Sequence, residues 1–348
     1  MYNCQKVRKR GFKFFLCVLL VCLFSFFWFP KTSIAESQSM KQLIEGAKQE
    51  GEIVYYASMG VIGMTAMIAK FEKKYPFMKV KMVRLNSQKL LTRVLAETRA
   101  KRYAADVIQT VAFSMHLLIK KGVLGHYVST ENNFYPKDFK EQDYWTCAYF
   151  LPYVVAYNTR LVTRENLPKT YDDLLSPKWK GKMMMEPTKV DWFAGMLQIM
   201  GREKGLEFMR ELSKQDIGQR NGHTLIATLV AAGEAELQIN TPTSAPERVK
   251  NSGAPIDWVA LGPVPGIMIG IGKTSKAAHP NAAKLFVDYV LSAEAQRVML
   301  GDPLFYNSVR SDIAQAAKYK ALQVVPVDPA SADNITEYSK LLRKIFAR

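Results

Sequence analysis

The lysine of GIGKTSK, residues 270–276, stands in the kind of glycine-rich segment that can bind a phosphate group. In a phosphate-binding loop four residues separate the first glycine from the Gly-Lys pair, so that glycine would be at position 267. Ile267 stands there, and the nearest earlier glycine, Gly266, lies one residue too early. The segment therefore predicts a glycine-rich strand and turn rather than a nucleotide site.

Metal chemistry needs histidine, cysteine or carboxylate side chains that converge on one point. The four histidines are far apart and never fall four residues apart on one helix: His116, His126, His223 and His279. We therefore expect no metal and no other cofactor. We expect His223, at a predicted helix start, to be a polar neighbour of the helix cap.

Nucleophilic catalysis is not indicated either. The sequence has no G-x-S-x-G motif, and Cys147 lies in the apolar run WTCAYF, residues 145–150, which predicts a packed thiol in a strand. The neighbouring carboxylates Asp172 and Asp173 fall on a polar helix face. Because no nucleophile, base and oxyanion donor come together, we expect a protein that is not an enzyme. An active site built from scattered residues stays open as an alternative.

The first 35 residues have the features of a secretory signal peptide. Lysines and arginines precede a mainly apolar run, residues 14–29, and Ser33 and Ala35 stand before a predicted cleavage point at Glu36. The run is shorter than the roughly 20 residues that span a bilayer, and an uncleaved anchor is the alternative. Cleavage would leave Cys147 as the single cysteine, so no internal disulfide could form. We expect a free periplasmic protein.

The basic residues are spread along the chain. The net charge is +17 and would fall to +11 on cleavage, because residues 1–35 hold six lysines and arginines and no acidic residue. An excess without a basic arm favours solvated surfaces and attraction to an anionic cell envelope over nucleic-acid binding. We expect a monomer with no nucleic-acid partner.

The elements that would position a site alternate between strand and helix. In the first half, strands are predicted at residues 52–58, 79–85 and 105–110, and helices at residues 40–49, 63–75 and 87–101, the last with Ser87 as N-cap. In the second half, strands are predicted at residues 183–187, 235–240, 257–261 and 266–272, and helices at residues 190–200, 223–232, 281–291 and 294–300. Such repeats predict parallel sheets with helices on their faces.

Ligands of open parallel sheets bind beyond the carboxyl ends of the strands, where helix N-termini offer free N–H groups. This rule nominates five loops before any family is considered. They are residues 58–60, 86–88, 110–112, 187–191 and 240–244.

Six runs of sequence stand out together. They are FEKKYP (71–76), ADVIQ (105–109), YVVAYNTRLV (153–162), LPKTYDDLLSPKWKGKMMMEP (167–187), AAGEAELQI (231–239) and HPNAAKLFVDYVLSAEAQRVM (279–299). Taken together, they resemble the periplasmic substrate-binding proteins of ABC importers, in particular the ferric-ion-binding branch of the type II fold. The runs follow the family's order and cover most of the chain after residue 35.

The resemblance implies an α/β protein with two lobes, each a mostly parallel sheet flanked by helices, which close on a solute by hinge motion. It places two crossover strands near residues 154–158 and 264–268. Lobe one would combine residues 36–155 with 266–301, and lobe two residues 156–265 with 302–348. The implied partners are a small-molecule ligand and an inner-membrane ABC permease.

The sequence departs from the ferric-ion-binding branch at three ligand positions. The family's tyrosine pair would fall in INTPTSAPER (239–248), its carboxylate in TVAF (110–113) and its histidine in ASMG (57–60), and none of these segments holds the expected residue. The loop that holds a synergistic anion corresponds to PTKVDW (187–192). Ferric iron would need tyrosines from elsewhere, such as Tyr153 or Tyr306, and stays open as an alternative.

The remaining candidates for ligand contact are hydroxyls, amides, one carboxylate and aromatic rings. They are Ser58, Ser87, Gln88, Thr110, Tyr153, Thr188, Asp191, Trp192, Asn240, Thr243 and Tyr306. Such a set suits a small organic solute, and the basic background favours an anionic one. Asp191 could bind an ammonium or hydroxyl group, and Arg220 is the candidate anion partner. We predict a solute receptor for an ABC permease, with a receptor coupled to a membrane sensor as a further alternative.

Overall fold

The first part of the chain that the structure describes is a single helix. The computed structural model describes residues 31–347, so the apolar run of the predicted signal peptide lies outside the described residues. Helix α2 (Lys31–Glu50) begins earlier than the predicted residue 40 and runs through the predicted cleavage point. The described residues divide into two units between Glu45 and Gly46, and the second unit contains every strand described below.

The first sheet begins with the predicted β-then-α repeats. Its elements are β1 (Glu52–Ala57), α3 (Val61–Lys74), β2 (Lys79–Arg84), α4 (Ser87–Arg99), β3 (Val107–Val111) and α5 (Ala112–Lys120). β1 lies between β2 and β3 and is parallel to both, which confirms the predicted parallel sheet. The N-cap of α4 is Asn86 and not Ser87, because the Asn86 side chain accepts a hydrogen bond from the Lys89 N–H at 2.9 Å.

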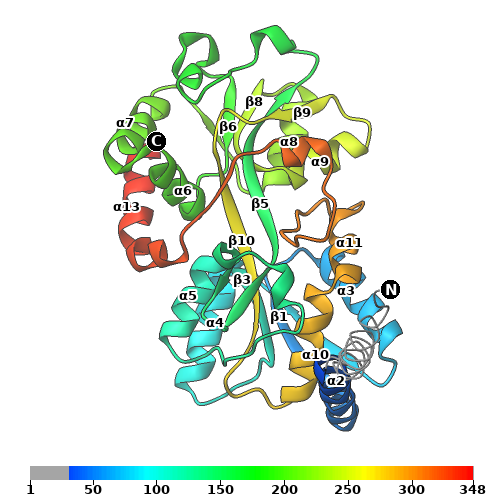
Figure 1. Cartoon of the computed structure of the whole chain (residues 1–348). Coiled ribbons are helices and arrows are strands. Elements are labelled where there is room, and N and C mark those ends of the chain that lie inside the picture. The colour runs from blue at the N-terminus through cyan, green and yellow to red at the C-terminus, as the bar shows by residue number, and fades with distance from the viewer. Residues whose placement is uncertain (1–30, 348) are drawn as a thin grey trace, which may run out of the picture. The chain divides into compact units, whose positions relative to one another are not determined.

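Two long strands, β5 (Trp145–Asn158) and β10 (Val264–Lys273), run through the middle of residues 46–348 (Figure 1). β10 is antiparallel to β3 and to the first half of β5. The second half of β5 pairs with β8 and β9, which belong to a second sheet. The predicted crossover segments near residues 154–158 and 264–268 lie in these two strands.

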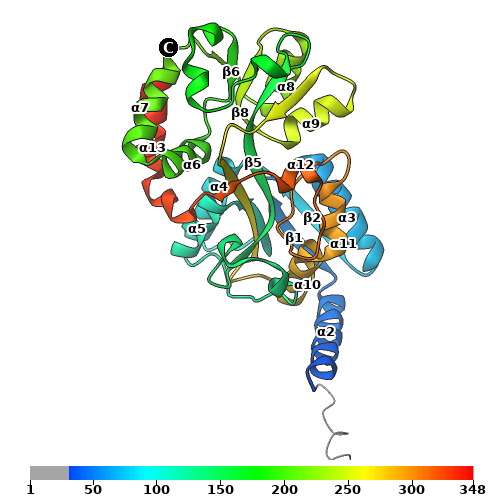
Figure 2. The same cartoon turned by 45° about the horizontal axis from the view of Figure 1, so that its top comes forward.

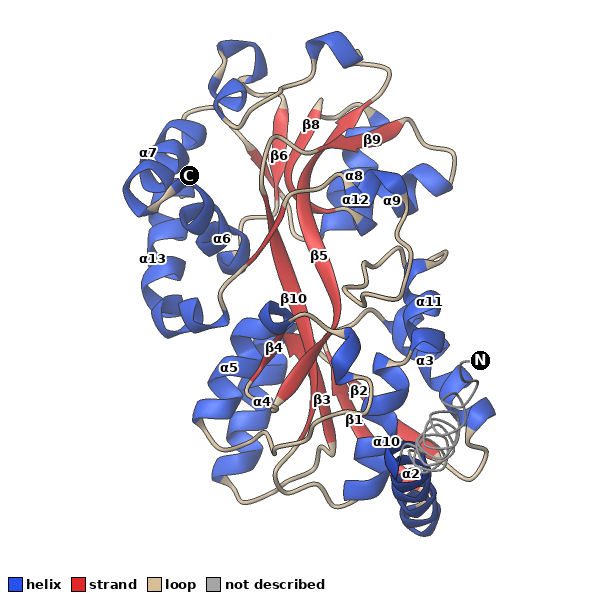
Figure 3. Cartoon of the chain, in the orientation of Figure 1, coloured by secondary structure: helices blue, strands red, loops and turns tan. Residues whose placement is uncertain are grey.

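The second sheet is also covered by helices on both faces. Its strands are β6 (Met183–Met185), β7 (Gly218–Gln219), β8 (Leu237–Pro242) and β9 (Ile256–Val259), with helices α6 (Val190–Met200), α7 (Arg202–Ser213), α8 (His223–Ala232) and α9 (Ser244–Asn251). β6 is parallel to β7 and β8. Figure 3 shows α6 and α7 on one side of these strands and α8 and α9 on the other. The fold is therefore the predicted α/β class.

The C-terminal segment contacts both sheets. It contains α10 (Pro280–Leu291), α11 (Ala293–Leu300), α12 (Ala317–Lys320), β11 (Val324–Pro326), η6 (Pro329–Asn334) and α13 (Ile335–Phe346). Asn307 and Phe150 form a bridge beside the first sheet, β11 pairs with β10, and α13 packs on α6 and α7. Between them η6 meets α5, where Lys120 and Asp333 form an ion pair of 2.8 Å. Figure 2 shows this segment passing α12 and crossing β5 toward α13.

The remaining elements are short. They are η1 (Asn132–Phe134), η2 (Lys137–Phe139), β4 (Lys140–Glu141), η3 (Arg164–Asn166), η4 (Asp172–Leu175) and η5 (Pro177–Trp179). Asp173 in η4 accepts hydrogen bonds from the Lys169 and Thr170 N–H groups at 2.7 and 3.0 Å. This carboxylate therefore stabilises a turn.

The strand predictions for Cys147 and for the glycine-rich segment are confirmed. Cys147 is buried in β5, where burial raises the pKa of its thiol. Gly270 and Gly272 lie in β10, and a Cβ atom at Gly270 would be 2.6 Å from the Trp145 ring. Close packing of this tryptophan, rather than phosphate binding, explains that glycine.

Apolar packing holds each helix layer to its sheet. Separate clusters of buried side chains lie under α6 and α7, under α4 and α5, and under α8 and α9. Within residues 31–347 the helices are all too short or too polar to cross a bilayer.

Candidate solute-binding site

Backbone hydrogen bonds hold the nominated loop after β1 against β3 and the nominated loop after β8 against the centre of β5. The Ser58 N–H, just after β1, donates to the Gln109 carbonyl of β3 at 2.9 Å. The Thr243 N–H, just after β8, donates to the Pro152 carbonyl of β5 at 3.0 Å, and the Asn307 side chain donates to the Thr243 hydroxyl at 3.1 Å. The strand ends of both sheets are thus connected through β5 and residues 301–310.

One group of side chains on the first-sheet side carries no formal charge, and we call it the neutral cluster. It consists of Tyr55, Gln109, Thr110, Tyr149 and Tyr306. The rings of Tyr149 and Tyr306 stack with centroids 4.2 Å apart and planes 10° apart, and the Tyr55 hydroxyl donates to the Gln109 side-chain oxygen. Burial raises the pKa values of Tyr55 and Tyr149 well above the usual range, so both phenols stay protonated.

Two polar atoms of the neutral cluster lack a hydrogen-bond partner among the described residues. They are Gln109 Nε2 and Thr110 Oγ1, and both side chains are fully buried. Asn307 Oδ1, beside Thr243, is also buried without a hydrogen-bond partner among the described residues. Gln109 and Thr110 are consecutive in β3, so their side chains face opposite sides of the sheet. Leaving a buried polar atom unpaired costs about 1–3 kcal/mol, so each of these atoms is a candidate for a hydrogen bond with a ligand or ordered water.

A second group of side chains on the second-sheet elements is charged or titratable, and we call it the charged cluster. It consists of Glu186, Lys189, Asp191, His223 and Arg248. Glu186 follows β6, Lys189 and Asp191 begin α6, His223 begins α8, and Arg248 lies in α9. Lys189 Nζ pairs with Glu186 at 3.2 Å, so these two charges offset each other.

His223 is joined to Tyr153 of β5. The Tyr153 hydroxyl lies 3.2 Å from His223 Nε2, while His223 Nδ1 is buried without a partner among the described residues. Burial, together with the positive charges of Lys189 and Arg248, lowers the pKa of His223 well below its ordinary value. The ring is therefore neutral and has one nitrogen that faces no protein group. Burial raises the pKa of Tyr153, and the charges of Asp191 and Glu186 add to this effect.

Arg248 is the cation that the sequence reasoning missed. Its Nη1 donates to the Leu304 carbonyl at 3.1 Å, and no carboxylate among the described side chains of residues 39–347 lies within 4.0 Å of its guanidinium. Leu304 is two residues before Tyr306, so this bond connects Arg248 to the segment that carries a ring of the neutral cluster. The positive charge of Arg248 also lowers the pKa of His223 and opposes the rise in the pKa of Tyr149. The signal was present in INTPTSAPER, where the helix beginning at Ser244 places Arg248 about one turn from the end of β8.

Arg220, the predicted anion partner, does not have this position. It is exposed, and its Nη1 donates to the adjacent Gln219 carbonyl at 2.8 Å. His223 is the first residue of α8, next to the N-cap Gly222, as expected, and its ring also contacts Tyr153. Arg220 and His223 both lie near the start of α8. The packing of this helix brings the His223 ring against Tyr153 and leaves the Arg220 side chain exposed.

The other predicted residues divide between the site and the structure around it. Thr188 is exposed and its hydroxyl donates to Glu186 at 2.7 Å, whereas Asn240 is buried and bonds the Glu186 backbone twice, at 2.8 and 2.9 Å. Trp192 is 3% exposed and belongs to the apolar cluster under α6. Ser87 and Gln88 lie in the first turn of α4, with no hydrogen bond to another predicted site residue in the described part of the chain.

The histidines outside the charged cluster serve local contacts. His116 pairs with Glu141 at 2.8 Å, His279 with Asp106 at 2.8 Å, and His126 stacks on Tyr144. Within the described residues, no three His, Cys, Asp or Glu side chains form a group suited to a metal ion.

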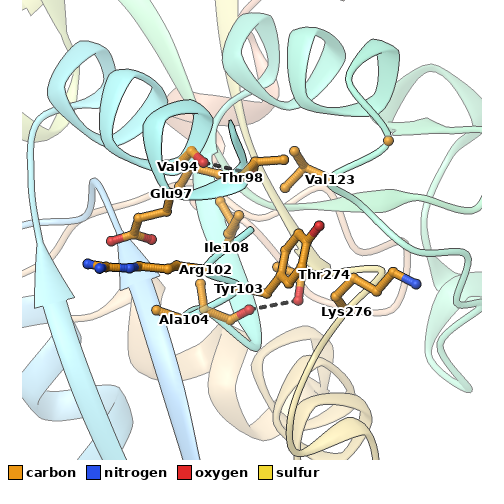
Figure 4. Close-up of a pocket in the computed structure, with 12 residues that line it drawn as sticks. Val94, Glu97, Thr98, Arg102, Tyr103, Ala104, Ile108, Val123, Thr274 and Lys276 are labelled. Carbon is orange, nitrogen blue, oxygen red and sulfur yellow. Dashed lines mark hydrogen bonds between the residues drawn. The ribbon is translucent and has the colours of Figure 1, made fainter. Parts of the chain in front are cut away.

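A small cavity lies elsewhere in the first sheet, between α4 and the start of β3 (Figure 4). It has a volume of about 30 Å³, and its lining includes Tyr103, Arg102 and Lys276. That volume holds about one water molecule. Because the cavity is at the amino end of β3, it is not the site at the strand ends.

Comparison with known families then gives the class of the protein. The model of the bacterial extracellular solute-binding proteins matches residues 61–297, which is more than half of the chain. The protein belongs to this family. Its members work with small-molecule ligands and ABC permeases. No curated protein matches the sequence.

Solved structures share the fold of this solute-binding protein at low sequence identity. Iron-bound HitA from Pseudomonas aeruginosa matches with a TM-score of 0.75 and 20% identity over 84% of this chain and 99% of that one. AfuA from Actinobacillus pleuropneumoniae, with fructose-6-phosphate bound, gives 0.72 and 22% over 84% and 97%. The Trichodesmium protein IdiA (FutA), with iron and citrate, gives 0.70 and 21% over 86% and 100%. At these identities the likeness supports the type II periplasmic binding fold and does not decide the solute.

Proposed function

We propose that the protein binds a small organic anion between its two lobes in the periplasm and delivers it to an inner-membrane ABC permease. The observation that carries this proposal is the state of Arg248, a partly buried guanidinium with a single backbone acceptor and no carboxylate within reach in the described residues. A partly buried cation is stabilised by an anion, and arginine matches carboxylates and phosphates in two-point hydrogen bonds.

The groups around Arg248 suit binding without reaction. The neutral cluster offers unpaired hydrogen-bonding atoms and a stacked pair of rings, and His223 offers one free ring nitrogen. The Tyr153 hydroxyl lies beside His223, and burial raises the pKa of this phenol well above its usual range, which disfavours it as a nucleophile. We infer that the protein is a receptor and not an enzyme, and that it acts as a monomer without nucleic acid.

The proposal uses the predicted division into lobes with one change. We assign residues 302–312 to lobe one, because Tyr306 stacks on Tyr149 and Arg310 donates to the Leu291 carbonyl at 2.8 Å. The crossovers then lie in β5 and β10, and the two clusters face the same hinge. Cleavage after Ala35 is part of the proposal, since a free receptor must leave the membrane.

Ferric iron remains the second candidate, through the tyrosines that converge near Arg248. The phenolate form that iron requires is disfavoured, because burial raises the pKa values of Tyr55, Tyr149 and Tyr153. A charge-transfer absorption band on adding ferric citrate would favour iron, and calorimetric binding without such a band would favour an organic anion.

The deciding experiment is calorimetric titration of the purified protein with carboxylates, sugar phosphates, amino acids and ferric citrate, followed by variants. We expect an organic anion to bind and Arg248→Met to lose about 100-fold in affinity, which corresponds to about 2.7 kcal/mol for a charged hydrogen-bonded pair.

The matched control is Arg220→Met, which removes an exposed arginine that belongs to neither cluster and should leave the affinity unchanged. Equal affinities of the Arg248 and Arg220 variants, or binding of ferric ion alone, would contradict the proposal.

A further inference from the structure

The charged cluster contains one anion as well as one cation without a partner. Asp191 lies in the first turn of α6 and is partly buried, and its side-chain hydrogen bond is with the adjacent Trp192 N–H at 2.9 Å. Among the described residues no lysine, arginine or histidine nitrogen lies within 4.0 Å of its carboxylate. Asp191 therefore keeps acceptor capacity that the protein does not use.

The nearest cation is engaged elsewhere. Lys189 stands two residues before Asp191, and its ammonium pairs with Glu186, which also accepts the Thr188 N–H and hydroxyl at 3.1 and 2.7 Å. Glu186 is buried and has all the partners it needs. The pairing of Lys189 with Glu186 leaves Asp191 as the unpaired acid and Arg248 as the unpaired base of the cluster.

The two unpaired charges follow the carboxyl ends of adjacent parallel strands: Asp191 comes after β6 and Arg248 after β8. Asn240 of β8 joins these two strand ends through its hydrogen bonds with the Glu186 backbone. The charge of Asp191 acts on the pKa of Tyr153, and the charge of Arg248 acts on the pKa of His223. The Tyr153 hydroxyl and His223 Nε2 are 3.2 Å apart, so a short chain of contacts links acid to base. A solute lying along this chain would meet a negative group at one end and a positive group at the other.

We propose that the solute is a small zwitterion whose anionic group is bound by Arg248 and His223 Nδ1 and whose ammonium is bound by Asp191. A simple anion would leave Asp191 facing the negative charge of the solute, which costs binding free energy. An ammonium group supplies the donors that the carboxylate lacks. This inference rests on the proposed function and assigns its substrate class.

The experiment compares pairs of anions that differ by one amine: glutamate and glutarate, β-alanine and propionate, taurine and ethanesulfonate, phosphoethanolamine and ethyl phosphate. Calorimetry on the full mature chain should give at least 30-fold tighter binding for the amine-bearing member of the best pair. Asp191→Asn should remove most of this preference, by weakening the binding of the amine-bearing member and by tightening that of the amine-free member, which no longer meets a like charge.

Two controls keep the result interpretable. Asp172→Asn, in the exposed start of η4, should preserve the preference, and circular dichroism should show that the Asp191 variant is folded. Equal binding of both members of the best pair overturns the zwitterion and leaves the anion receptor standing. Tighter binding of a hydroxyl-bearing analogue than of the amine assigns Asp191 to a hydroxyl and also overturns it. Failure of every anion to bind overturns both proposals.

Discussion

The two clusters beside β5 differ in how their side chains are satisfied. In the neutral cluster the rings pack tightly, Tyr149 on Tyr306, and the side chains are almost fully buried. In the charged cluster every group except the buried Glu186 is partly exposed, and two of them, Asp191 and Arg248, lack an opposite charge in the described residues. Close packing in the neutral cluster stabilises the fold, whereas the unpaired charges of the charged cluster are available to bind a solute. We therefore call the neutral cluster the structural half of the site and the charged cluster its selective half.

The largest effect expected from this comparison is on stability. Tyr149→Ala removes a buried ring and its stacking partner's contact, so we expect the free energy of unfolding to fall by about 3–5 kcal/mol. Urea denaturation followed by circular dichroism measures this change. Tyr103→Ala, at a site where the side chain is 46% exposed, should stay within about 0.5 kcal/mol. Similar losses for the two variants would show that the neutral cluster is not a structural half.

The unpaired polar atoms of the neutral cluster should matter for affinity rather than for stability, in contrast to its rings, and the expected effect is smaller. Thr110→Val replaces a buried hydroxyl without a partner by a methyl group of the same shape, so stability should hold or rise by up to about 1 kcal/mol. If the hydroxyl binds solute, affinity should fall about five- to tenfold, which titration calorimetry detects.

The matched variant for Thr110 is Thr98→Val. The Thr98 hydroxyl donates to the Val94 carbonyl at 2.8 Å, away from the strand ends, so its loss should leave affinity unchanged. An unaltered affinity in the Thr110 variant would remove this residue from the site.

The smallest expected effect is the change in the free energy of unfolding when the unpaired carboxylate of Asp191 is removed from the charged cluster. Burial raises the pKa of Asp191 in the folded protein above its unfolded value, so the group favours folding below the unfolded pKa, and this contribution is lost as pH rises through the folded pKa. Asp191→Asn should therefore be more stable than the natural protein at pH 7 and not at pH 3. The gain should stay below about 1 kcal/mol, because an acidic residue in the first turn of α6 is favoured by the helix dipole.

Thermal unfolding of Asp191→Asn and the natural protein at several pH values measures that difference. A variant that is less stable at pH 7 and equal at pH 3 would mean that the helix dipole outweighs burial, and that Asp191 stabilises the fold rather than costs it.

Hydrophobic periodicity and capping signals were enough to place most elements. α6 and α8 begin and end where the sequence predicts, and Gly233 ends α8 in the left-handed conformation that glycine favours. The nominated loops also lie at the strand ends. These features depend on local sequence, and tertiary packing does not override them.

The role of each site residue depended on tertiary packing and could not be predicted in the same way. Trp192 and Asp191 are neighbours in sequence, but the helix turns the ring into the core and leaves the carboxylate at the edge. Arg248 is the last residue of the segment INTPTSAPER (239–248), in which the expected tyrosine ligands of iron are missing. Its importance comes from the absence of a nearby carboxylate, which no single stretch of sequence reveals.

The most direct test of the account is a crystal structure of the protein with its tightest-binding anion. The account predicts an intact solute beside Tyr153, with its anionic group about 3 Å from the Arg248 guanidinium. A solute bound at another place, or one chemically altered in the crystal, would contradict it.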